Sequence, residues 1–596
     1  MRPVDSKGGG EEAFVPTTVA GVLWQRACST PDRRAYAFLD ERGVERDEWT
    51  YEALARRARA IAKVLLAEAR PGDRAALVFE PGMAFLDAFF GCLYAGVIAV
   101  PMMPPKRNRE QHTSSAILRD CAPRLILTTQ ALIGSLRQRL DVFGIEPLPS
   151  YVAVDEVGAD ADTEVEPVYR SDADDIAFLQ YTSGSTSVPK GVMVTNRNLR
   201  ANAFMIAAAM QQDDNSNFVG WAPFYHDQGL IGNVLQPLHL GAPAVLMAPN
   251  TFLQRPHLWV EAVAKYRAHT SGGPDFAFRL VADRIDPEAY RGLDLSCWKI
   301  AFNGAEPIRP DTLDRFAGAL APFGFSRQAL YPCYGLAEAT LFTTGAMAGC
   351  GPFTRFFDRA GQEQGRLRPA AEGVRLASSG RAAPGVTLAI VEPRTRAPLP
   401  EGEIGEIWIK AASVGRGYWR RPDVTSEIFG ATTLDGNGPF LRTGDLGALI
   451  DGELYVCGRI KDLVIVRGRN LYPQDLEATA CAAHPAVSQG TAAAAAVTID
   501  DAEKLLLAIE INRSARHAAD PAEISAAIRR AIRDEHDVMI DRLVLLMPGA
   551  VPKTTSGKVR RRAVAYAFET GQLAAWREDG RYPAPAENAN PQEMYE

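Results

Sequence analysis

The chain has 596 residues, of which 47% are hydrophobic and 23% charged, a composition typical of folded globular proteins. Its length exceeds what one compact core supports, so several domain-sized units are expected. The net charge of −7, from 65 basic and 72 acidic residues, gives no electrostatic reason to expect nucleic acid or an anionic membrane as a partner.

No pattern of a signal peptide, a membrane span or a C-x-x-C motif is visible in the sequence. Residues 1–12 are polar and rich in glycine, without the apolar segment of a signal peptide. The longest apolar stretch, 88–103, is short for a membrane span and is interrupted by glycines and Pro101, so we interpret it as a buried helix followed by a core strand. The eight cysteines form no C-x-x-C pair, which argues against a zinc site or a disulfide framework. We therefore expect a cytoplasmic protein without integral membrane association.

The first third of the chain alternates between helices and apolar strands. This alternation predicts an α/β sheet covered on both faces. Pro101 is expected to end the second strand, because proline cannot donate to a sheet ladder. The predicted helices are 18–28, 51–69, 85–95 and 131–140, and the predicted strands are 74–79, 97–100 and 124–128.

Two apolar strands, 176–181 and 191–195, flank a hydroxyl-rich loop that ends in Pro189 and Lys190. Such a loop can direct backbone N–H groups, hydroxyls and an ammonium at a polyphosphate. It also fits an ordinary hairpin turn with no ligand. It differs from the usual nucleotide P-loop, because Lys190 leads into an apolar strand rather than a helix.

The middle of the chain repeats one pattern, in which a short apolar run ends in a polar turn. Predicted strand 218–222 is followed by His226 and Asp227, at the end of a strand where open α/β sheets bind ligands. His226 alone could equally cap a loop. Three further turns, 271–274, 303–307 and 334–338, could converge with the hydroxyl-rich loop on one ligand, although each is ordinary turn chemistry. Between them we expect helices at 198–210 and 258–267 and a strand at 244–247.

Residues 349–378 lose all periodicity, with at most a short helix near Asp358, and loops of this length are usually functional or disordered. A β-rich part follows, with strands expected at 388–391, 405–410 and 453–456. Asp445 ends a glycine turn there, where its carboxylate could accept two ribose hydroxyls or simply complete a β-turn.

A boundary is expected at 458–462, and the segment after it has the pattern of a small α+β domain. The basic run 558–562 would by itself be a solvated face. The predicted strands are 463–466, 503–511 and 542–547, and the predicted helices are 475–483 and 522–535.

Taken in order, these motifs resemble the adenylate-forming superfamily of acyl-CoA ligases, luciferases and nonribosomal adenylation domains, from about residue 15 to 570. Within it the chain looks most like the fatty acyl-AMP ligases. The superfamily resemblance lies in 181–191, 334–338, 443–445, 458–462 and 552–558, and the subgroup resemblance in 226–232, 303–307, 338–341 and 470–477. Gln228 and Asp275 depart from the residues that are frequent in that subgroup, which bears on acyl specificity.

The resemblance implies a role for each motif. The hydroxyl-rich loop would hold the β- and γ-phosphates of ATP, Glu338 would hold Mg²⁺, and His226 would border the acyl entrance. Lys558 would bridge the fatty carboxylate and the α-phosphate, and Lys461 would be the hinge. The implied phosphate ligands are Thr182, Ser183, Gly184, Ser185, Thr186 and Lys190; the implied adenine and ribose ligands are Asn303, Gly304, Ala305, Glu306, Tyr334, Gly335, Asp445 and Arg459.

The implied fold is α/β, with a large N-terminal domain of α/β sheets plus a β-rich subdomain and a small mobile α+β C-terminal domain. The expected parts are a tail (1–12), the large domain (13–457, with an insertion at about 349–377 and the β-rich subdomain at about 378–457), a hinge (458–462), the small domain (463–570) and a polar tail (571–596).

The implied activity is the ATP-dependent conversion of a medium- or long-chain fatty acid to its acyl adenylate, with release of pyrophosphate. The subgroup's insertion implies transfer to an acyl carrier protein supplied in trans rather than to CoA, and we expect a monomer. Two alternatives remain: a fatty acyl-CoA synthetase, and a catalytically silent adenylate-binding protein.

Overall fold

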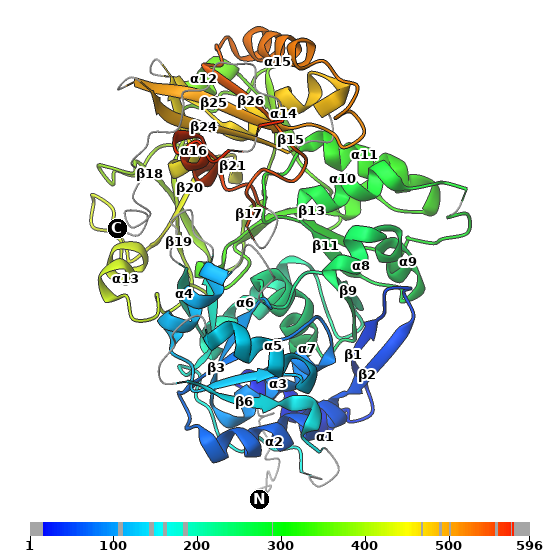
Figure 1. Ribbon diagram of the computed structural model, residues 1–596. Coiled ribbons are helices and arrows are strands. Elements are labelled where there is room, and N and C mark those ends of the chain that lie inside the picture. The colour runs from blue at the N-terminus through cyan, green and yellow to red at the C-terminus, as the bar shows by residue number, and fades with distance from the viewer. Residues whose placement is uncertain are drawn as a thin grey trace, which may run out of the picture.

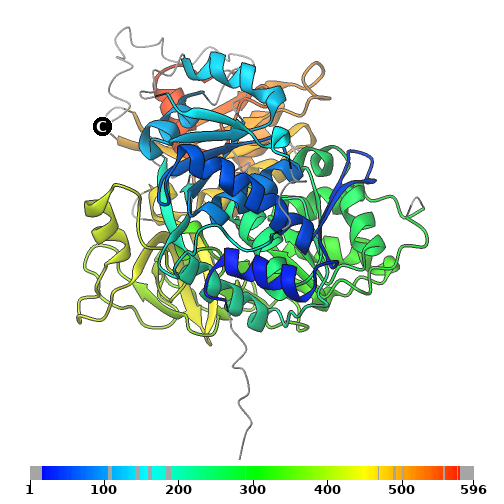
Figure 2. The same ribbon diagram turned by 90° about the horizontal axis from the view of Figure 1, so that it is seen from below.

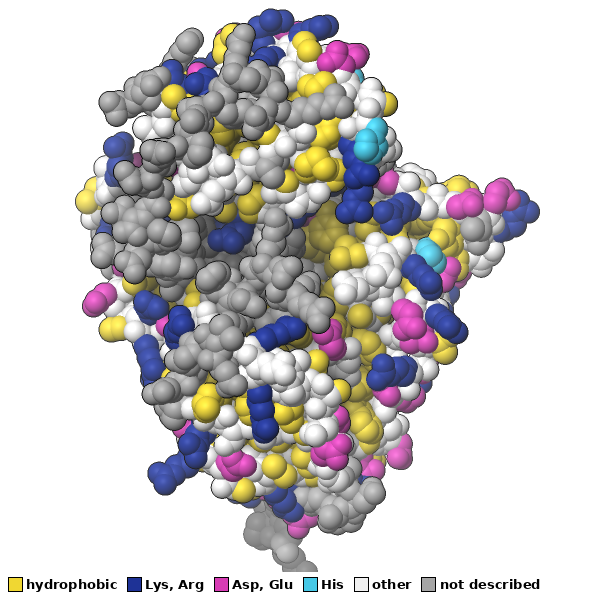
Figure 3. Space-filling view, viewed as in Figure 1, with side chains coloured by type: hydrophobic (Ala, Val, Ile, Leu, Met, Phe, Trp, Pro, Cys, Tyr) yellow, Lys and Arg dark blue, Asp and Glu magenta, His cyan; other side chains and the backbone are white. Residues whose placement is uncertain are grey.

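A computed structural model describes residues 16–104, 111–141, 148–158, 164–182, 189–288, 290–466, 469–487, 491–499, 502–554, 558–573 and 575–576. The N-terminal elements fill the lower half of Figure 1 and the C-terminal elements its top. Basic and acidic side chains are interspersed over the face in Figure 3, in keeping with the small net charge. No helix in the described ranges is long and apolar enough to cross a bilayer.

The first sheet runs β6-β5-β3-β4-β7-β8 and is parallel except for the antiparallel pair β7–β8. Its helices α2 and α3 pack closely at Gly91, where a Cβ would lie 2.4 Å from Cγ2 of Ile61. Helices α1 and α2 lie side by side across the underside of the molecule (Figure 2). The strands are β3 (Arg74–Val78), β4 (Ile98–Met102), β5 (Leu125–Thr128), β6 (Ser150–Ala153), β7 (Ile176–Thr182) and β8 (Lys190–Thr195); the helices are α1 (Val19–Ser29), α2 (Tyr51–Glu68), α3 (Met83–Ala95), α4 (Gln111–Cys121) and α5 (Gln130–Asp141).

The expectation that Pro101 ends its strand is wrong, because β4 continues to Met102. Pro101 stays in register with Leu77 of β3. On its other side, the ladder to β7 in the described residues is formed at Ala99 and Phe178. Pro101 therefore lies beyond the position where β7 requires a donor, which is where a strand tolerates proline.

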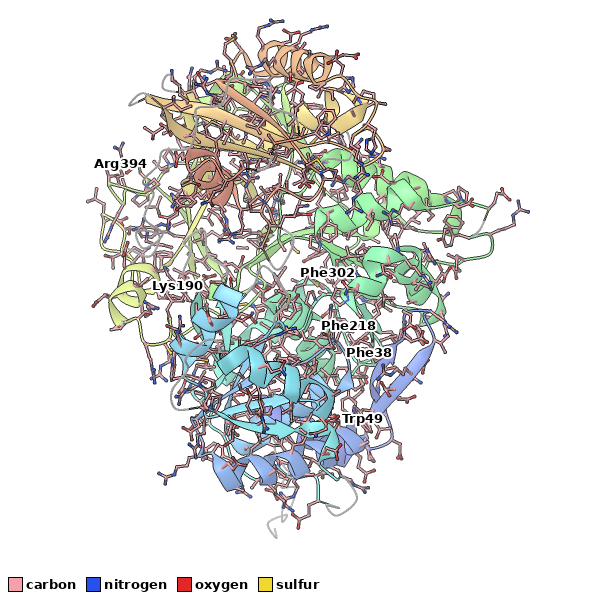
Figure 4. The ribbon with its side chains drawn as sticks, in the orientation of Figure 1. Phe38, Trp49, Lys190, Phe218, Phe302 and Arg394 are labelled. Atoms are coloured by element: carbon pink, nitrogen blue, oxygen red, sulfur yellow. The ribbon has the colours of Figure 1, made fainter. Side chains whose placement is uncertain are left out.

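The second sheet runs β17-β14-β13-β12-β11-β9-β10-β1-β2. Strands β1 and β9 to β13 are parallel, so their carboxyl ends share one edge. Phe38, Phe218 and Phe302 mark three of these strands in Figure 4. The strands are β1 (Arg34–Leu39), β2 (Glu45–Thr50), β9 (Phe218–Gly220), β10 (Ala244–Met247), β11 (Thr270–Gly273), β12 (Ile300–Asn303), β13 (Leu330–Tyr334), β14 (Thr344–Gly345) and β17 (Arg381–Ala382); the helices are α6 (Asn196–Ala209), α7 (Gln236–Leu240), α8 (Pro249–Gln254), α9 (His257–Lys265), α10 (Asp275–Arg284) and α11 (Pro310–Leu320).

The segment expected to be irregular, 349–378, is largely ordered. Strands β15 (Thr354–Phe357) and β16 (Val374–Ala377) pair antiparallel, with α12 (Arg359–Glu363) between them. Phe357 is fully buried, 4.9 Å from the ring of Tyr455 in an edge-to-face contact. The strands escaped prediction because each is only four residues long and carries one arginine in its apolar pattern.

A third sheet, β18-β19-β20-β21, is antiparallel and corresponds to the β-rich part expected from the sequence. Its elements are β18 (Thr387–Val391), β19 (Gly405–Lys410), β20 (Leu441–Ile450) and β21 (Glu453–Arg459), with α13 (Pro422–Phe429) packed beside it.

The chain after residue 463 forms a smaller α+β unit with its own core, which we name the C-terminal module. Its sheet runs β24-β25-β26 (Figure 1), and Ala575 bridges to Leu546 beyond the last helix. Its elements are β22 (Val464–Val466), β23 (Arg469–Leu471), α14 (Pro473–Ala482), β24 (Ala492–Ile499), β25 (Ala502–Glu510), α15 (Pro521–His536), β26 (Arg542–Leu546) and α16 (Arg561–Glu569). The fold is therefore mixed α/β, with large sheets followed by a smaller α+β part, as predicted.

Candidate active site

The hydroxyl-rich loop joins β7 to β8, where Thr182 and Lys190 face each other in antiparallel register. The predicted phosphate ligands Ser183, Gly184, Ser185 and Thr186 lie outside the described residues. Lys190, labelled in Figure 4, is at the start of β8, and its Nζ is 5.2 Å from the centroid of the Tyr418 ring. The ammonium group of Lys190 is thus held where the loop ends and β8 begins.

Glu338 belongs to a short 3-10 helix, Ala337–Ala339, just beyond β13. Its Oε1 accepts a hydrogen bond of 2.9 Å from the hydroxyl of Tyr418. Burial raises the pKa of Glu338, although the hydrogen bonds that it accepts oppose the effect. No group of three metal-binding side chains occurs in the described ranges, so a cation at Glu338 would draw its other ligands from substrate and water, as Mg²⁺ commonly does.

Asp445 lies at the centre of a polar triad formed by residues of three strands, β13, β20 and β21. Asp445 of β20 and Arg459 of β21 are paired in register, and Arg459 Nε is 3.0 Å from Asp445 Oδ1. The hydroxyl of Tyr334 donates to Asp445 Oδ2 at 2.8 Å. Asp445 itself is 6% exposed. A buried carboxylate held in this way is suited to accept sugar hydroxyls.

Asn303 ends β12, and Gly304, Ala305 and Glu306 follow in the turn after it. Gly304 is pressed against the neighbouring strand, because a Cβ there would lie 2.9 Å from the carbonyl oxygen of Cys333. At the end of β13, a Cβ on Gly335 would lie 1.6 Å from the carbonyl oxygen of Leu341, so a side chain cannot fit. Gly304 therefore lets the turn after β12 lie against β13, and Gly335 lets the chain after β13 fold back on Leu341.

Asp275, one of the two residues that differ from those frequent in the subgroup, supports this turn through hydrogen bonds. Its Oδ1 accepts from Asn303 Nδ2 at 3.3 Å and from the N–H of Arg309 at 3.1 Å. Its Oδ2 accepts from the hydroxyl of Thr312 at 2.9 Å. Because both oxygens bond to the protein and the side chain is buried, Asp275 shapes the turn.

His226 and Asp227 follow β9, whose carboxyl end lies on the shared edge. His226 Nδ1 is 2.5 Å from Asp227 Oδ1, and the N–H of Gln228 donates to the same oxygen at 2.7 Å. Burial works against ionisation, but His226 and Lys558 hold the pKa of Asp227 below its usual value. The loop is tied to the first sheet, because Gln180 Nε2 donates to the carbonyl oxygen of Tyr225 at 2.8 Å.

Gln228, the other departure, begins a π-helix, Gln228–Leu235, that the sequence did not predict. Its side chain is buried, and its Nε2 has no hydrogen-bond partner among the described residues. Gly229 lets the start of this helix lie close against the preceding loop, because a Cβ there would lie 2.0 Å from the carbonyl oxygen of Pro223.

Lys558 reaches this site from the C-terminal module. Burial and the charge of Arg459 lower its pKa, whereas Asp227, Asp445 and Glu306 raise it. Its backbone is fixed by Thr554, whose hydroxyl accepts from the N–H of Lys558 at 3.0 Å. One ammonium therefore lies within the electrostatic reach of three carboxylates, one after β9, one after β12 and one on β20.

Lys461 belongs to a short 3-10 helix, Ile460–Asp462, between β21 and the C-terminal module. Burial lowers the pKa of Lys461, and so do the charges of Arg562 and Lys190. The predicted hinge residue thus lies within electrostatic reach of both Lys190 of the first sheet and Arg562 of α16.

Sequence reasoning missed Tyr418 and misjudged Arg561. Tyr418 belongs to no motif that indicates a functional site, and its hydrogen-bond partner Glu338 is 80 positions away in the sequence. The run 558–562 was expected to be solvated, but Arg561 forks onto Glu477 at 2.7 and 2.8 Å and reaches Asp462 at 3.0 Å. The clue was present in Asp462 and Glu477, which belong to the same motifs as the hinge and its following helix.

Comparison with known proteins gives matches along almost the whole chain. Residues 23–419 match the model of the AMP-binding enzyme family, and residues 461–578 match that of the Disco-interacting protein 2-like AMP domain. The chain is 39% identical to the medium-chain-fatty-acid–[acyl-carrier-protein] ligase JamA of Moorena producens, covering 94% of this chain and 96% of that protein. It is 38% identical to the long-chain-fatty-acid–AMP ligase FadD26 of Mycobacterium tuberculosis, covering 92% and 96%.

Solved structures agree with these relatives. A fatty acyl-adenylate ligase of Legionella pneumophila, in complex with acyl adenylate and pyrophosphate, superposes with a TM-score of 0.73 at 36% identity, covering 95% of this chain and 98% of that one. A structure from a study of fatty acyl-adenylate ligases of Escherichia coli and L. pneumophila gives a TM-score of 0.82 at 32% identity, covering 93% and 98%.

Proposed function

Because this chain belongs to the family of AMP-binding enzymes, we propose that it joins a fatty acid to AMP and passes the acyl group to a carrier protein. The observation that carries the proposal is that Lys558, from the C-terminal module, lies within electrostatic reach of the carboxylates of Asp227, Asp445 and Glu306. Lys558 comes from a different part of the chain than the groups suited to bind a nucleotide. It can therefore act on a substrate that those groups hold.

The chemistry requires positive charge where two anions meet. An oxygen of the fatty carboxylate forms a bond to the α-phosphorus of ATP, and the bond from that phosphorus to the β-phosphate oxygen breaks. Pyrophosphate leaves with the electron pair. At about 4 Å and an effective dielectric near 20, each pair of unit charges repels by roughly 4 kcal/mol. The ammonium of Lys558 would offset this repulsion by bridging carboxylate and α-phosphate.

The remaining site residues would hold the nucleotide. Asp445 and Arg459 would take the ribose, and the turn 303–306 with the ring of Tyr334 would enclose adenine. Thr182, Lys190 and the loop between them would bind the β- and γ-phosphates. Glu338 would hold Mg²⁺, which neutralises phosphate charge when bound. His226, fixed by Asp227, would border the place where the fatty carboxylate enters.

The experiment is a product assay with the full-length protein, ATP, Mg²⁺ and fatty acids of medium and long chain. Parallel reactions contain no acceptor, CoA, or a carrier protein bearing phosphopantetheine. We expect acyl-AMP without an acceptor, acyl-carrier protein in the third reaction and little acyl-CoA in the second. Robust acyl-CoA formation would show that CoA, not a carrier protein, is the acyl acceptor. Absence of acyl-AMP at every chain length would overturn the proposal entirely.

A further inference from the structure

The segment 415–419 joins the two halves of the phosphate end of the site through its backbone. The N–H of Gly415 donates to the carbonyl oxygen of Glu338 at 2.8 Å. Farther along, the N–H of Trp419 donates to the carbonyl oxygen of Gly191 at 2.8 Å, and Tyr418 bridges antiparallel to Val192 of β8. Tyr418 is therefore fixed relative to both Glu338 and the start of β8, where Lys190 lies.

The side chain of Tyr418 repeats this connection. Its hydroxyl donates to Glu338 Oε1 at 2.9 Å, and the face of its ring lies 5.2 Å from Lys190 Nζ. The residue is 7% exposed, and its ring packs edge-to-face on Phe429 at 5.1 Å. Packing leaves the ring one position, so the phenol cannot turn away from either partner.

We propose that Tyr418 is a positioning residue that holds Glu338 and Lys190 at a fixed separation, so that one can take a divalent cation and the other the phosphates of the same nucleotide. This inference rests on the proposed function. The hydrogen bond fixes the plane of the Glu338 carboxylate, as a partner behind a metal ligand commonly does. The separation is thereby set before nucleotide binds.

The aromatic contact suits a lysine that must later bind phosphate. A carboxylate beside Lys190 would neutralise its charge and occupy its donors. The ring face attracts the ammonium through its quadrupole and accepts no conventional hydrogen bond. Lys190 can therefore be oriented while its N–H groups stay available to phosphate oxygens.

The hydroxyl of Tyr418 distinguishes a positioning role from simple packing. A phenylalanine would fill the same space and keep the contacts with Phe429 and Lys190. The hydroxyl adds a buried polar group, and the hydrogen bond described for it in the structure goes to Glu338. Burying a hydroxyl without such a partner is costly, so the hydroxyl is explained by Glu338.

Three variants of the full-length protein separate these contributions. Tyr418→Phe removes the hydrogen bond and keeps the ring, and Tyr418→Leu removes both. The matched control is Trp419→Phe. Trp419 is the next residue, but its ring faces the guanidinium groups of Arg74 and Arg420, at 5.6 and 5.7 Å, rather than Glu338 and Lys190. Each protein is titrated with ATP by calorimetry, once with Mg²⁺ and once with a chelator, and its melting temperature is recorded.

We expect Tyr418→Phe to weaken Mg²⁺-dependent ATP binding roughly 10-fold, and to leave metal-free ATP binding and the melting temperature like those of the control. Tyr418→Leu should weaken metal-free binding as well, because Lys190 loses its aromatic contact. The idea is overturned if Tyr418→Phe matches Trp419→Phe in Mg²⁺ dependence, or if its melting temperature falls without a change in that dependence. Because binding is read without turnover, failure of the wild type to form acyl-AMP would be a separate result that concerns the proposed function.

Discussion

We expect Arg561→Met to loosen the C-terminal module while leaving the large sheets intact. Arg561 Nε and Nη2 contact the two carboxylate oxygens of Glu477 at 2.7 and 2.8 Å, and Nη1 contacts Asp462 Oδ2 at 3.0 Å. The side chains of Arg561, Glu477 and Asp462 are 18%, 9% and 15% exposed. Glu477 Oε1 also accepts from the N–H of Ala494 at 2.9 Å, so the cluster links α14, β24, α16 and the short helix Ile460–Asp462.

The expected magnitude follows from burial. Methionine keeps much of the volume of arginine but leaves two carboxylates without their cation. Removing one partner of a buried ion pair costs roughly 3–5 kcal/mol, and the partial exposure of Asp462 favours the lower end. A loss of about 3 kcal/mol changes an opening equilibrium by roughly 150-fold, since about 1.4 kcal/mol is one factor of ten.

Hydrogen exchange on the full-length protein is the assay, because it reports local opening rather than one global transition. We expect peptides that cover α14 and β24 to lose protection roughly 100-fold, while peptides from β9 to β12 keep theirs. The control is Arg197→Met, which breaks an exposed pair with Asp174 and should cost at most about 1 kcal/mol. The reasoning is refuted if α14 and β24 lose no more protection in Arg561→Met than in the control.

Three further changes test the site and its surroundings. Lys558→Ala should lower ATP–pyrophosphate exchange roughly 100-fold or more without unfolding the protein, and near-normal exchange would contradict its proposed role. Asp445→Asn should raise the KM for ATP roughly 10-fold, because hydrogen bonds to a charged group contribute about 1.5–3 kcal/mol each; an unchanged KM would remove Asp445 from the ribose site. Burial raises the pKa of Asp475 to about 6, so the folded state holds this proton more tightly than the unfolded chain does, and stability is lost as the pH rises from about 4 to about 6. Asp475→Asn should therefore increase the free energy of unfolding near neutral pH by about 1–3 kcal/mol and lose that advantage below about pH 4, whereas an equal difference at both pH values would speak against the assignment.

Elements with an uninterrupted apolar pattern were predictable from the sequence. Helix α3 is one example, because it is apolar except for Asp87 and is buried along nearly its whole length. Strand β2 shows the opposite case. It is an edge strand made largely of charged residues, and Arg34 of β1 pairs with Glu45 and Glu48 across the two strands. Charges on an edge strand prevent further pairing, and they also remove the apolar signal from which a strand is predicted.

Within the site, the sequence predicted which turns meet but not what holds each side chain. Parallel strands share one edge, so the turns after β9, β12 and β13 had to approach one another. The contact between Tyr418 and Glu338 joins segments 80 positions apart and depends on how the segment after β19 packs against the short helix after β13. Such a contact leaves no spacing pattern in the chain, and only tertiary structure reveals it.

The side chains on either side of Lys461 support the proposal that it is the hinge. Arg459, two residues before it, is bound to Asp445 of β20. Asp462, one residue after it, is bound to Arg561 of α16, three residues beyond Lys558. Attachment therefore changes from the large sheets to the C-terminal module within four residues, and a backbone rotation at Lys461 would leave both ion pairs intact. Because Arg561 is only three residues from Lys558 in the chain, such a rotation would carry the lysine with it and withdraw its charge from the nucleotide after adenylation, while Asp445, in its proposed role, would stay at the ribose.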